Sequence, residues 1–427
     1  MIDLNLIRTN KELVKENIKK KFQDQKLPLV DKVLVLDEKY RQLKQEADNL
    51  RSTRNTKSSE IGALVRAQKT DEISKIKEEV NVINQKIEKL EVEENELSQK
   101  IKDIMMKIPN IMADTVPIGK DDSENVERQT FGEKTKYDFE VPYHIDILEK
   151  LDGIDLDSAR RVSGSGFYYL IGDIARLHSA VLTYARDFMI DKGFTYVIPP
   201  YLIRGDVVEG VMSFEERDAM MYKIEGEDLY LIGTSEHSMI GKFKDNLIDV
   251  NELPIKMTSY SPCFRKEKGA HGIEERGIYR IHQFEKQEMI VVCHPKDSVE
   301  WYQKMWNYTV ELFRTLDIPV RTLECCTGDL SDLKYESLDV EAWSPRQQKY
   351  FEIASCSNLT EAQSRRLGIR IKDGKEKYYA HTLNNTVIAP PRMLIAFIEN
   401  NLNADGSINI PKVLRSYMGN IDKITIK

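Results

Sequence analysis

Apolar residues recur at alternating three- and four-residue spacings along two stretches of the first hundred residues. The first stretch runs from Val33 to Leu64 and the second from Ile73 to Ile108, each with only a few polar interruptions. A mean period of 3.5 residues is typical of the seam of a coiled coil. Because the short polar segment 66–71 separates the two stretches, we predict a long antiparallel α-helical coiled-coil arm over about residues 31–108.

Beyond residue 150 the pattern changes to short helices mixed with strands. Residues 177–192 and 391–401 have helical periodicity, whereas strand-like segments rich in β-branched and aromatic residues occupy 194–203, 255–265 and 278–292. The strands do not alternate regularly with helices, so we expect an α+β domain with an antiparallel β-sheet flanked by helices. Glycine motifs of the Rossmann or P-loop type are missing from the sequence, which removes the main support for those folds.

The chain of 427 residues is too long for one ordinary core. Between the two patterns lies a mixed polar stretch punctuated by Pro109, Pro117, Gly119 and Pro142, which is typical of a boundary. We therefore predict an N-terminal domain over 1–108, a linker over 109–150 and a large domain over 151–427.

Composition bears on where in the cell the protein is located. No apolar run approaches the roughly 20 residues of a membrane span, and the N-terminal residues do not resemble a secretory signal. The five cysteines are scattered without C-x-x-C spacing, which favours reduced thiols. We therefore expect a cytoplasmic protein with no membrane partner.

The arm carries an uneven distribution of charge. The net charge of the chain is −7, yet from Arg51 to Lys77 seven basic residues face only three acidic ones. A coiled coil that only dimerises the protein is one interpretation. A basic stretch on a rigid arm also suits the phosphate backbone of a nucleic acid. The candidate contacts are Arg51, Arg54, Lys57, Arg66 and Lys69.

Five segments of the large domain carry recognisable motifs. In chain order they are the helix and strand ending in Pro199-Pro200, Gly233–Glu236, Phe264–Glu267 with Tyr279–Glu288, Phe351–Asn358, and Leu383–Arg392. The first, third and fifth resemble the three signature motifs of class II aminoacyl-tRNA synthetases. The other two, and the arm, are similar to those of the seryl-tRNA synthetase family. The ordered set, rather than any single motif, carries the resemblance.

The resemblance implies a homodimeric ligase that activates serine with ATP and Mg²⁺. Seryl-adenylate and pyrophosphate would form first, and serine would then pass to the 3′ end of tRNA(Ser), which would bind to the arm. Nothing resembles the zinc ligands of the methanogen-type branch, so no zinc is expected. The sequence leaves open whether tRNA(Sec) is charged as well.

The chemistry of the motif residues is consistent with this reaction. Attack of a carboxylate on an α-phosphate needs cations that hold the geometry and neutralise developing charge. Arg265 is the candidate for the carboxylate and the α-phosphate. Arg280 and Arg392 are candidates for the other phosphates, because a planar guanidinium matches phosphate oxygens. A carboxylate is the usual protein ligand of Mg²⁺, and Glu352 is the leading candidate.

The remaining site residues follow from the resemblance, position by position. For ATP they are Glu267 and Phe284 at the adenine, with Ile281 and Ser355, and Ser355 also joins Glu352 as a Mg²⁺ ligand. For serine they are Thr234, Glu236, Arg265, Glu288, Asn384 and Thr386. We take Arg265, Arg392 and Glu352 as the catalytic set.

Two features depart from the family pattern. Asn385 stands where relatives commonly carry glycine, and we expect a left-handed turn there that asparagine tolerates. The Ala389-Pro390-Pro391 run before Arg392 is also unusual. Two alternatives stay open: a ligase of the same fold that charges a carrier protein, which would typically lack the arm, and a non-catalytic RNA-binding paralogue, which would be expected to have lost motif residues.

Overall fold

The computed structural model describes residues 1–66, 70–267 and 277–426. It separates into two compact units, one of Ile2–Pro109 and one of Met1 with Asn110–Lys427. Each unit is described here by itself.

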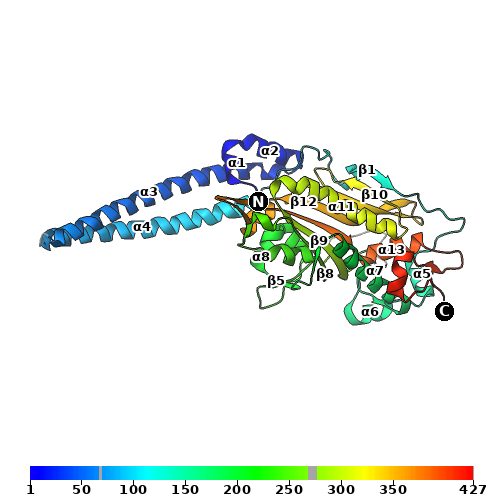
Figure 1. The fold of residues 1–427 in the computed structure, drawn as a ribbon. Coiled ribbons are helices and arrows are strands. Elements are labelled where there is room, and N and C mark those ends of the chain that lie inside the picture. The colour runs from blue at the N-terminus through cyan, green and yellow to red at the C-terminus, as the bar shows by residue number, and fades with distance from the viewer. Residues whose placement is uncertain (67–69, 268–276, 427) are drawn as a thin grey trace. The chain divides into compact units, whose positions relative to one another are not determined.

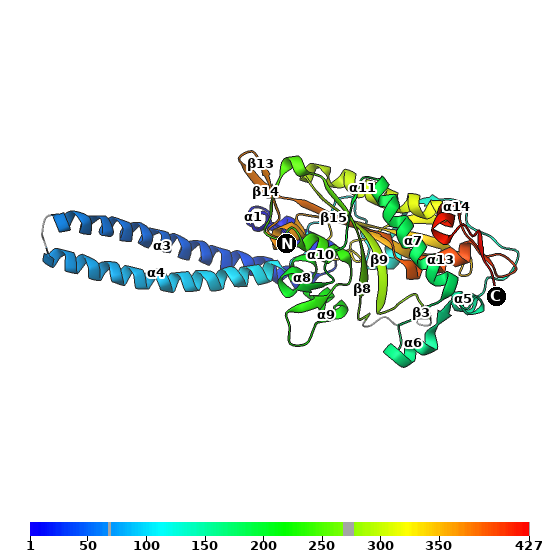
Figure 2. The ribbon, with the colours of Figure 1, turned by 60° about the horizontal axis from the view of Figure 1, so that its bottom comes forward.

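Two long helices dominate the first unit, α3 (Leu27–Arg66) and α4 (Thr70–Met105), which run antiparallel (Figures 1 and 2). The positions with heptad spacing are the less exposed ones, and Val33 and Ala47 on α3 are fully buried. Lys57, a polar interruption of the seam, forms an ion pair with Glu79 of α4. The coiled-coil arm is therefore confirmed, with an ion pair replacing one apolar contact.

Short helices precede the arm within the first unit. They are α1 (Leu4–Thr9), α2 (Lys11–Lys20) and the 3₁₀ helix Asp24–Lys26. The side chain of Asn10 accepts a hydrogen bond from the backbone N–H of Leu13 and so caps α2. Arg8 binds the buried carboxylate of Asp37 through Nε and Nη2, at 2.8 and 2.6 Å. These contacts fix the first turns against the start of α3.

An eight-stranded sheet organises the second unit, with the order β1-β10-β11-β12-β15-β9-β8-β4. All neighbours are antiparallel except β4 and β8, which are parallel. The strands are β1 (Val126–Phe131), β4 (Thr195–Val197), β8 (Ile255–Phe264), β9 (Gln283–Cys293), β10 (Val320–Glu324), β11 (Glu336–Ser344), β12 (Lys349–Thr360) and β15 (His381–Ile388). The predicted α+β class and the antiparallel sheet flanked by helices are confirmed.

Three helices build the main core on one face of this sheet: α7 (Gly172–Asp191), α11 (Ser298–Thr315) and α13 (Pro390–Asn400). Met289 and Val291 of β9 point into that core. Their neighbours Ile290 and Val292 belong instead to a second, smaller core with residues of α10 (Ser235–Gly241) and α12 (Ala362–Leu367). Alternate residues of β9 therefore serve opposite faces of the sheet.

The other elements of the second unit are short. The helices are α5 (His144–Lys150), α6 (Leu156–Ser163), α8 (Gly205–Val211), α9 (Phe214–Met220) and α14 (Lys412–Arg415), with 3₁₀ turns at Asp122–Glu124, Val250–Glu252, Pro295–Asp297 and Ser416–Met418. The small sheets pair β2 (Ile154–Asp155) with β3 (Tyr169–Leu170), β5 (Leu202–Arg204) with β6 (Leu229–Leu231), β16 (Ile408–Asn409) with β17 (Lys423–Ile424), and β13 (Arg370–Asp373) with β7 (Leu247–Asp249) and β14 (Glu376–Tyr379).

The structure adds detail to two predicted segments. The strand over 194–203, which the sequence interrupts with proline, consists of β4 and β5 on either side of Pro199-Pro200, because proline cannot donate to a strand ladder. The stretch 109–150, predicted as a linker, contains α5 and also β1, which pairs with β10 at the edge of the main sheet. Within the described residues, no helix combines the length and the apolar character that crossing a membrane requires.

Candidate active site

One cavity of the second unit is lined by every pocket residue that the sequence predicts. They are Thr234, Glu236, Arg265, Glu267, Arg280, Ile281, Phe284, Glu288, Glu352, Ser355, Asn384, Thr386 and Arg392. The sequence distance between the first and the last shows that the fold, not local sequence, brings them together. Their individual roles stay predictions.

The N-terminus of α10 supplies one wall of the cavity. Thr234 is the N-cap of this helix, and its hydroxyl accepts a hydrogen bond from the backbone N–H of Glu236 at 3.4 Å. The same hydroxyl donates to Oε2 of Glu288 at 3.4 Å. Gln363 of α12 donates to Oε1 of Glu236 at 2.7 Å. Burial, and then the charge of Glu288, raise the pKa of Glu236 to about 7.

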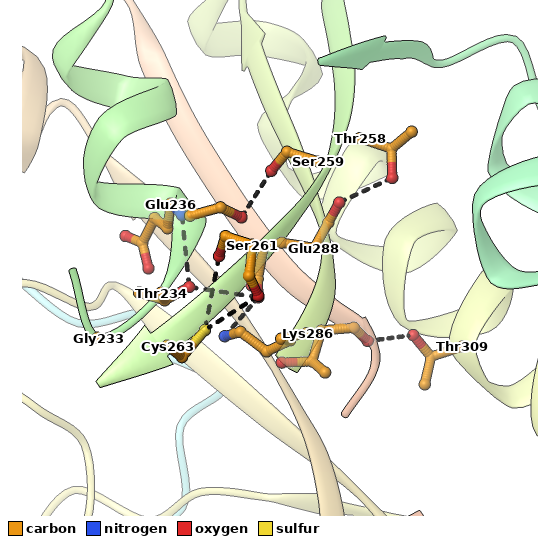
Figure 3. A network of polar contacts seen from close by, with 12 residues as sticks. Gly233, Thr234, Glu236, Thr258, Ser259, Ser261, Cys263, Lys286, Glu288 and Thr309 are labelled. Atoms are coloured by element: carbon orange, nitrogen blue, oxygen red, sulfur yellow. Dashed lines mark hydrogen bonds and ion pairs between the residues drawn. The ribbon is translucent and has the colours of Figure 1, made fainter. Parts of the chain in front are cut away.

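Strand β9 supplies the floor of the cavity through Phe284, Lys286 and Glu288, which alternate along the strand and share one face. Lys286 and Glu288 are buried and form an ion pair between Nζ and Oε2 (Figure 3). Lys286 was not predicted as a site residue. Its two-residue spacing from Glu288 was the available signal, because that spacing places both side chains on one face of a strand.

Arg265 follows the end of β8 and reaches across the cavity. Its Nε donates to the carbonyl of Gly233 at 3.1 Å, and its guanidinium carbon lies 5.3 Å from the ring centroid of Phe284. Beside it, Nη1 of Arg280 lies 3.4 Å from Oε2 of Glu267. These contacts leave both guanidinium groups at the wall of the cavity.

A β-bulge orients the acidic and hydroxyl residues of β12. Glu352 pairs with Glu341 of β11, whereas Ala354 pairs with Val340, so one extra residue is inserted between Glu352 and Ala354. In a regular strand, residues three apart face opposite sides. The inserted residue reverses this and brings Glu352 and Ser355 to the same cavity.

Arg392 is paired with Glu352. Its Nη1 donates to Oε2 of Glu352 at 2.8 Å, and its guanidinium carbon lies 4.7 Å from the ring centroid of Tyr279. Burial alone would raise the pKa of Glu352, but the charge and hydrogen bond of Arg392, together with the charges of Lys334 and Arg265, outweigh it and the pKa is lowered. The Pro390-Pro391 pair is explained by position, because it forms the first turn of α13, where the missing N–H groups have no helical partner.

The expected left-handed turn at Asn385 is wrong. Asn385 lies inside β15 and pairs in register with Cys356 and Met289. Its side chain donates to the carbonyl of Met305 at 2.9 Å and to the hydroxyl of Thr309 at 3.0 Å, both on α11. The strand period explains the difference: Asn384 and Thr386 face the cavity, so the residue between them must face α11.

Three possible metal ligands gather near the pocket: Cys325, Asp329 and Asp339, with ligand atoms within 4.8 Å of one another. Burial raises the pKa of the Cys325 thiol, and burial with the nearby charge of Glu352 raises the pKa of Asp339 to about 7. A protonated thiol is a poor ligand, and so is a carboxyl whose pKa is raised toward neutral pH. The zinc-independent site stays a prediction.

Comparison with known proteins resolves the identity of the family. The model of the seryl-tRNA synthetase N-terminal domain matches residues 1–112, and that of the class II tRNA synthetase core domain (G, H, P, S and T) matches residues 220–401. A serine–tRNA ligase of Thermococcus sibiricus is 41% identical, with 98% of this chain and 96% of the relative covered. The chain belongs to the seryl-tRNA synthetase family.

Other relatives agree with this assignment. A serine–tRNA ligase of Pyrococcus furiosus is 42% identical over 98% of this chain and 96% of its own length. The crystal structure of seryl-tRNA synthetase from Pyrococcus horikoshii complexed with ATP matches with a TM-score of 0.93 and 40% identity, covering all of both chains. The cytoplasmic serine–tRNA ligase of Naegleria fowleri in complex with AMP matches with a TM-score of 0.88 and 33% identity, covering 100% of this chain and 99% of the other.

Membership of the seryl-tRNA synthetase family makes the chain an ATP-dependent ligase that joins serine to tRNA. The predicted function and enzyme class are confirmed. The two alternatives, a ligase for a carrier protein and a non-catalytic RNA-binding paralogue, are not supported by the relatives, which carry the ligase name over nearly the whole chain.

The raised pKa of Glu236 leads to a prediction about stability. The unfolded carboxyl loses its proton near its ordinary pKa of 4.5, whereas the folded one keeps it to about pH 7. Between these values the folded state binds more protons, so the contribution of Glu236 to stability falls as the pH rises. We expect Glu236→Gln to raise the thermal midpoint relative to the parent more at pH 8 than at pH 5. The exposed Glu227→Gln is the control, and an equal difference at both pH values would contradict the raised pKa.

Proposed function

We propose that this cavity binds serine and ATP side by side and that the arm binds tRNA(Ser). The observation that supports the proposal is the segregation of residue types within one cavity. Three arginines and the Glu352–Ser355 pair provide groups suited to phosphates and a divalent cation. Thr234, Glu288, Asn384 and Thr386 are hydroxyl, carboxylate and amide groups suited to a small amino acid.

In the serine pocket, Glu288 binds the α-ammonium group and Arg265 binds the carboxylate. Asn384 and Thr386 bind the hydroxyl from β15, and Thr234 and Glu236 complete the wall. Asn384 and Thr386 are each only 8% exposed. Alanine in place of serine would leave these buried groups without a partner, which is the condition under which a site rejects an analogue strongly.

In the ATP pocket, Phe284 stacks on the adenine and Glu267 accepts a hydrogen bond from its amino group, with Ile281 beside the base. Arg280 and Arg392 hold the phosphates. The relatives from Pyrococcus horikoshii and Naegleria fowleri are complexes with ATP and AMP, which supports binding of an adenine nucleotide by this chain.

The residues on β12 fit a Mg²⁺ ion that arrives with ATP. The β-bulge brings a carboxylate and a hydroxyl, Glu352 and Ser355, to one face, and such hard oxygen ligands suit Mg²⁺. When bound there, the ion supplies positive charge to the phosphates. Arg392, which Glu352 holds in the free protein, is then available to bind a phosphate.

Two transfers follow from this arrangement. A carboxylate oxygen of serine attacks the α-phosphorus, the bond from that phosphorus to the bridging oxygen breaks, and pyrophosphate leaves. Arg265 neutralises charge that builds on the α-phosphate. A ribose hydroxyl at the 3′ end of tRNA then attacks the carbonyl carbon of seryl-adenylate, loses its proton and releases AMP.

On the arm, the proposed phosphate contacts are Arg51, Arg54 and Lys57. Arg51 pairs with Asp48 and Glu91, and its side chain is 33% exposed. Exposed ion pairs of this kind contribute little to stability, so a phosphate can replace the two carboxylates as the partner of Arg51. The side chain of Arg66 and the whole of Lys69 lie outside the described residues.

We also propose a cytoplasmic homodimer. The elements of the first motif, α7 and the segment after β4, expose large apolar side chains: Ile190 is 44% and Ile198 is 64% exposed. Exposed apolar side chains on adjoining elements are suited to a subunit interface.

The first prediction concerns activation of serine. We expect Arg265→Ala to lower the rate of serine-dependent pyrophosphate exchange by 10²–10³, roughly 3–4 kcal/mol, because the α-phosphate loses a charge-assisted donor. Arg370→Ala, an exposed position on β13, is the control. A variant that keeps more than about a third of the parent rate would remove Arg265 from the mechanism.

The second concerns the metal. Glu352→Gln keeps the shape of the side chain but removes a negative charge, so we expect the Mg²⁺ concentration for half-maximal exchange to rise several-fold. Glu341→Gln, its neighbour on β11, is the matched control. If exchange falls in Glu352→Gln while its Mg²⁺ dependence is unchanged, Glu352 is structural.

The third separates the arm from the chemistry. Residues 41–98 belong to the first unit, and those of them that the structure describes do not line the cavity. We expect replacing them by a short Gly/Ser turn to leave pyrophosphate exchange within a few-fold, while aminoacylation of tRNA(Ser) falls by orders of magnitude. Equal loss of both activities in a folded deletion variant would contradict the division.

Reversing the charges of Arg51, Arg54 and Lys57 should flatten the salt dependence of tRNA binding by about one unit for each phosphate that is no longer bound. Lys100→Glu is the control and should leave the salt dependence unchanged.

A further inference from the structure

The serine side of the cavity contains a buried cation that the proposed function does not use. Lys286 is 7% exposed and its partner Glu288 is 2% exposed. Burying an ammonium group is costly unless it is paired, so Lys286 is held there by its contact with Glu288. A lysine that contacts the carboxylate of Glu288 must affect how that carboxylate binds serine.

The two oxygens of Glu288 have different surroundings. Oε2 receives both the Nζ of Lys286 and the hydroxyl of Thr234 (Figure 3). Among the described residues, no donor contacts Oε1. The strand itself is fixed, because the hydroxyl of Thr258 donates to the backbone carbonyl of Glu288 at 2.8 Å. The carboxylate is therefore held by one oxygen while the other is left for a ligand.

The charges around this carboxylate make Lys286 important. Glu236 faces Glu288 from α10, and the like charge of Glu288 contributes to its raised pKa. Lys334 and Arg265 place further positive charge near these carboxylates from the surrounding loops. Burial, followed by the charges of Arg265 and Lys286, lowers the pKa of His237 to about 3, so this histidine is neutral. Among the described residues, Lys286 is the cation that contacts Glu288 directly.

We propose that Lys286 is a positioning residue that holds Oε2 of Glu288 and turns the carboxylate so that Oε1 receives the α-ammonium group of serine. The proposal rests on the role proposed above for Glu288. It differs from a second interpretation, in which Nζ of Lys286 occupies the place of the serine ammonium and competes with it. The two make opposite predictions for removal of the lysine.

The test measures the KM for serine and for ATP in pyrophosphate exchange at pH 7, each expressed as a ratio to the parent protein. Lys286→Met should raise the KM for serine about tenfold, the size of one charge-assisted hydrogen bond, with the KM for ATP within twofold. Lys286→Arg keeps the charge and should recover most of the loss.

Two further variants keep this test separate from the role of Glu288. Glu288→Gln should itself raise the KM for serine; if it does not, the proposed serine site is wrong, whatever Lys286 does. In the double variant Lys286→Met/Glu288→Gln, the KM should equal that of Glu288→Gln alone, because Lys286 acts through Glu288. This variant also avoids an unpaired buried carboxylate, so it reports even if Lys286→Met folds poorly.

Three results would overturn the proposal. A lower or unchanged KM for serine in Lys286→Met would favour competition or a passive role. A raised KM that arginine does not recover would show an effect on packing only. Additive effects of the two substitutions in the double variant would show that Lys286 does not act through Glu288.

Discussion

The pairing of opposite charges inside the cavity is the constraint on which this site depends. A charged group that is withdrawn from water needs a partner, because the cost of removing it from water is several kcal/mol. Lys286 and Glu288 are buried and pair with each other, whereas Arg392 and Glu352 are half-buried and form a second pair. Phosphates and a divalent cation suit the second pair, so binding can exchange its partners, while the first pair stays together and Oε1 of Glu288 binds the amino group.

The sheet supports this arrangement because it places Lys286, Glu288 and Glu352 on rigid strands. Arg392 lies on α13. Alternation along β9 directs Lys286 and Glu288 to the cavity and sends Met289 into the core. Where alternation would fail, on β12, an inserted residue brings Glu352 and Ser355 to one side. Sites built on strands hold their geometry better than sites on loops, and this one draws on adjacent strands of one sheet.

Much of this could be predicted from the sequence, and the limits have physical causes. The arm could be predicted because its apolar seam repeats over many turns. The pocket residues could be predicted because they lie in motifs that follow one another in a known order. Asn385 was misjudged because a motif comparison suggests a turn, whereas its place between two cavity-facing residues of β15 decides its orientation. Gln363 had no sequence signal: it meets Glu236 only because α12 and α10 both pack against α8, which joins segments 127 residues apart.

The most direct test of the exchange of partners is a crystal structure of the protein with serine, a non-hydrolysable ATP analogue and Mg²⁺. The account predicts that the 2.8 Å contact between Nη1 of Arg392 and Oε2 of Glu352 is broken, with the arginine on a phosphate and the carboxylate on the metal. Lys286 should stay on Oε2 of Glu288 while the serine ammonium binds Oε1. An intact Arg392–Glu352 pair beside fully bound substrates, with the phosphates and the metal held by other residues, would contradict it.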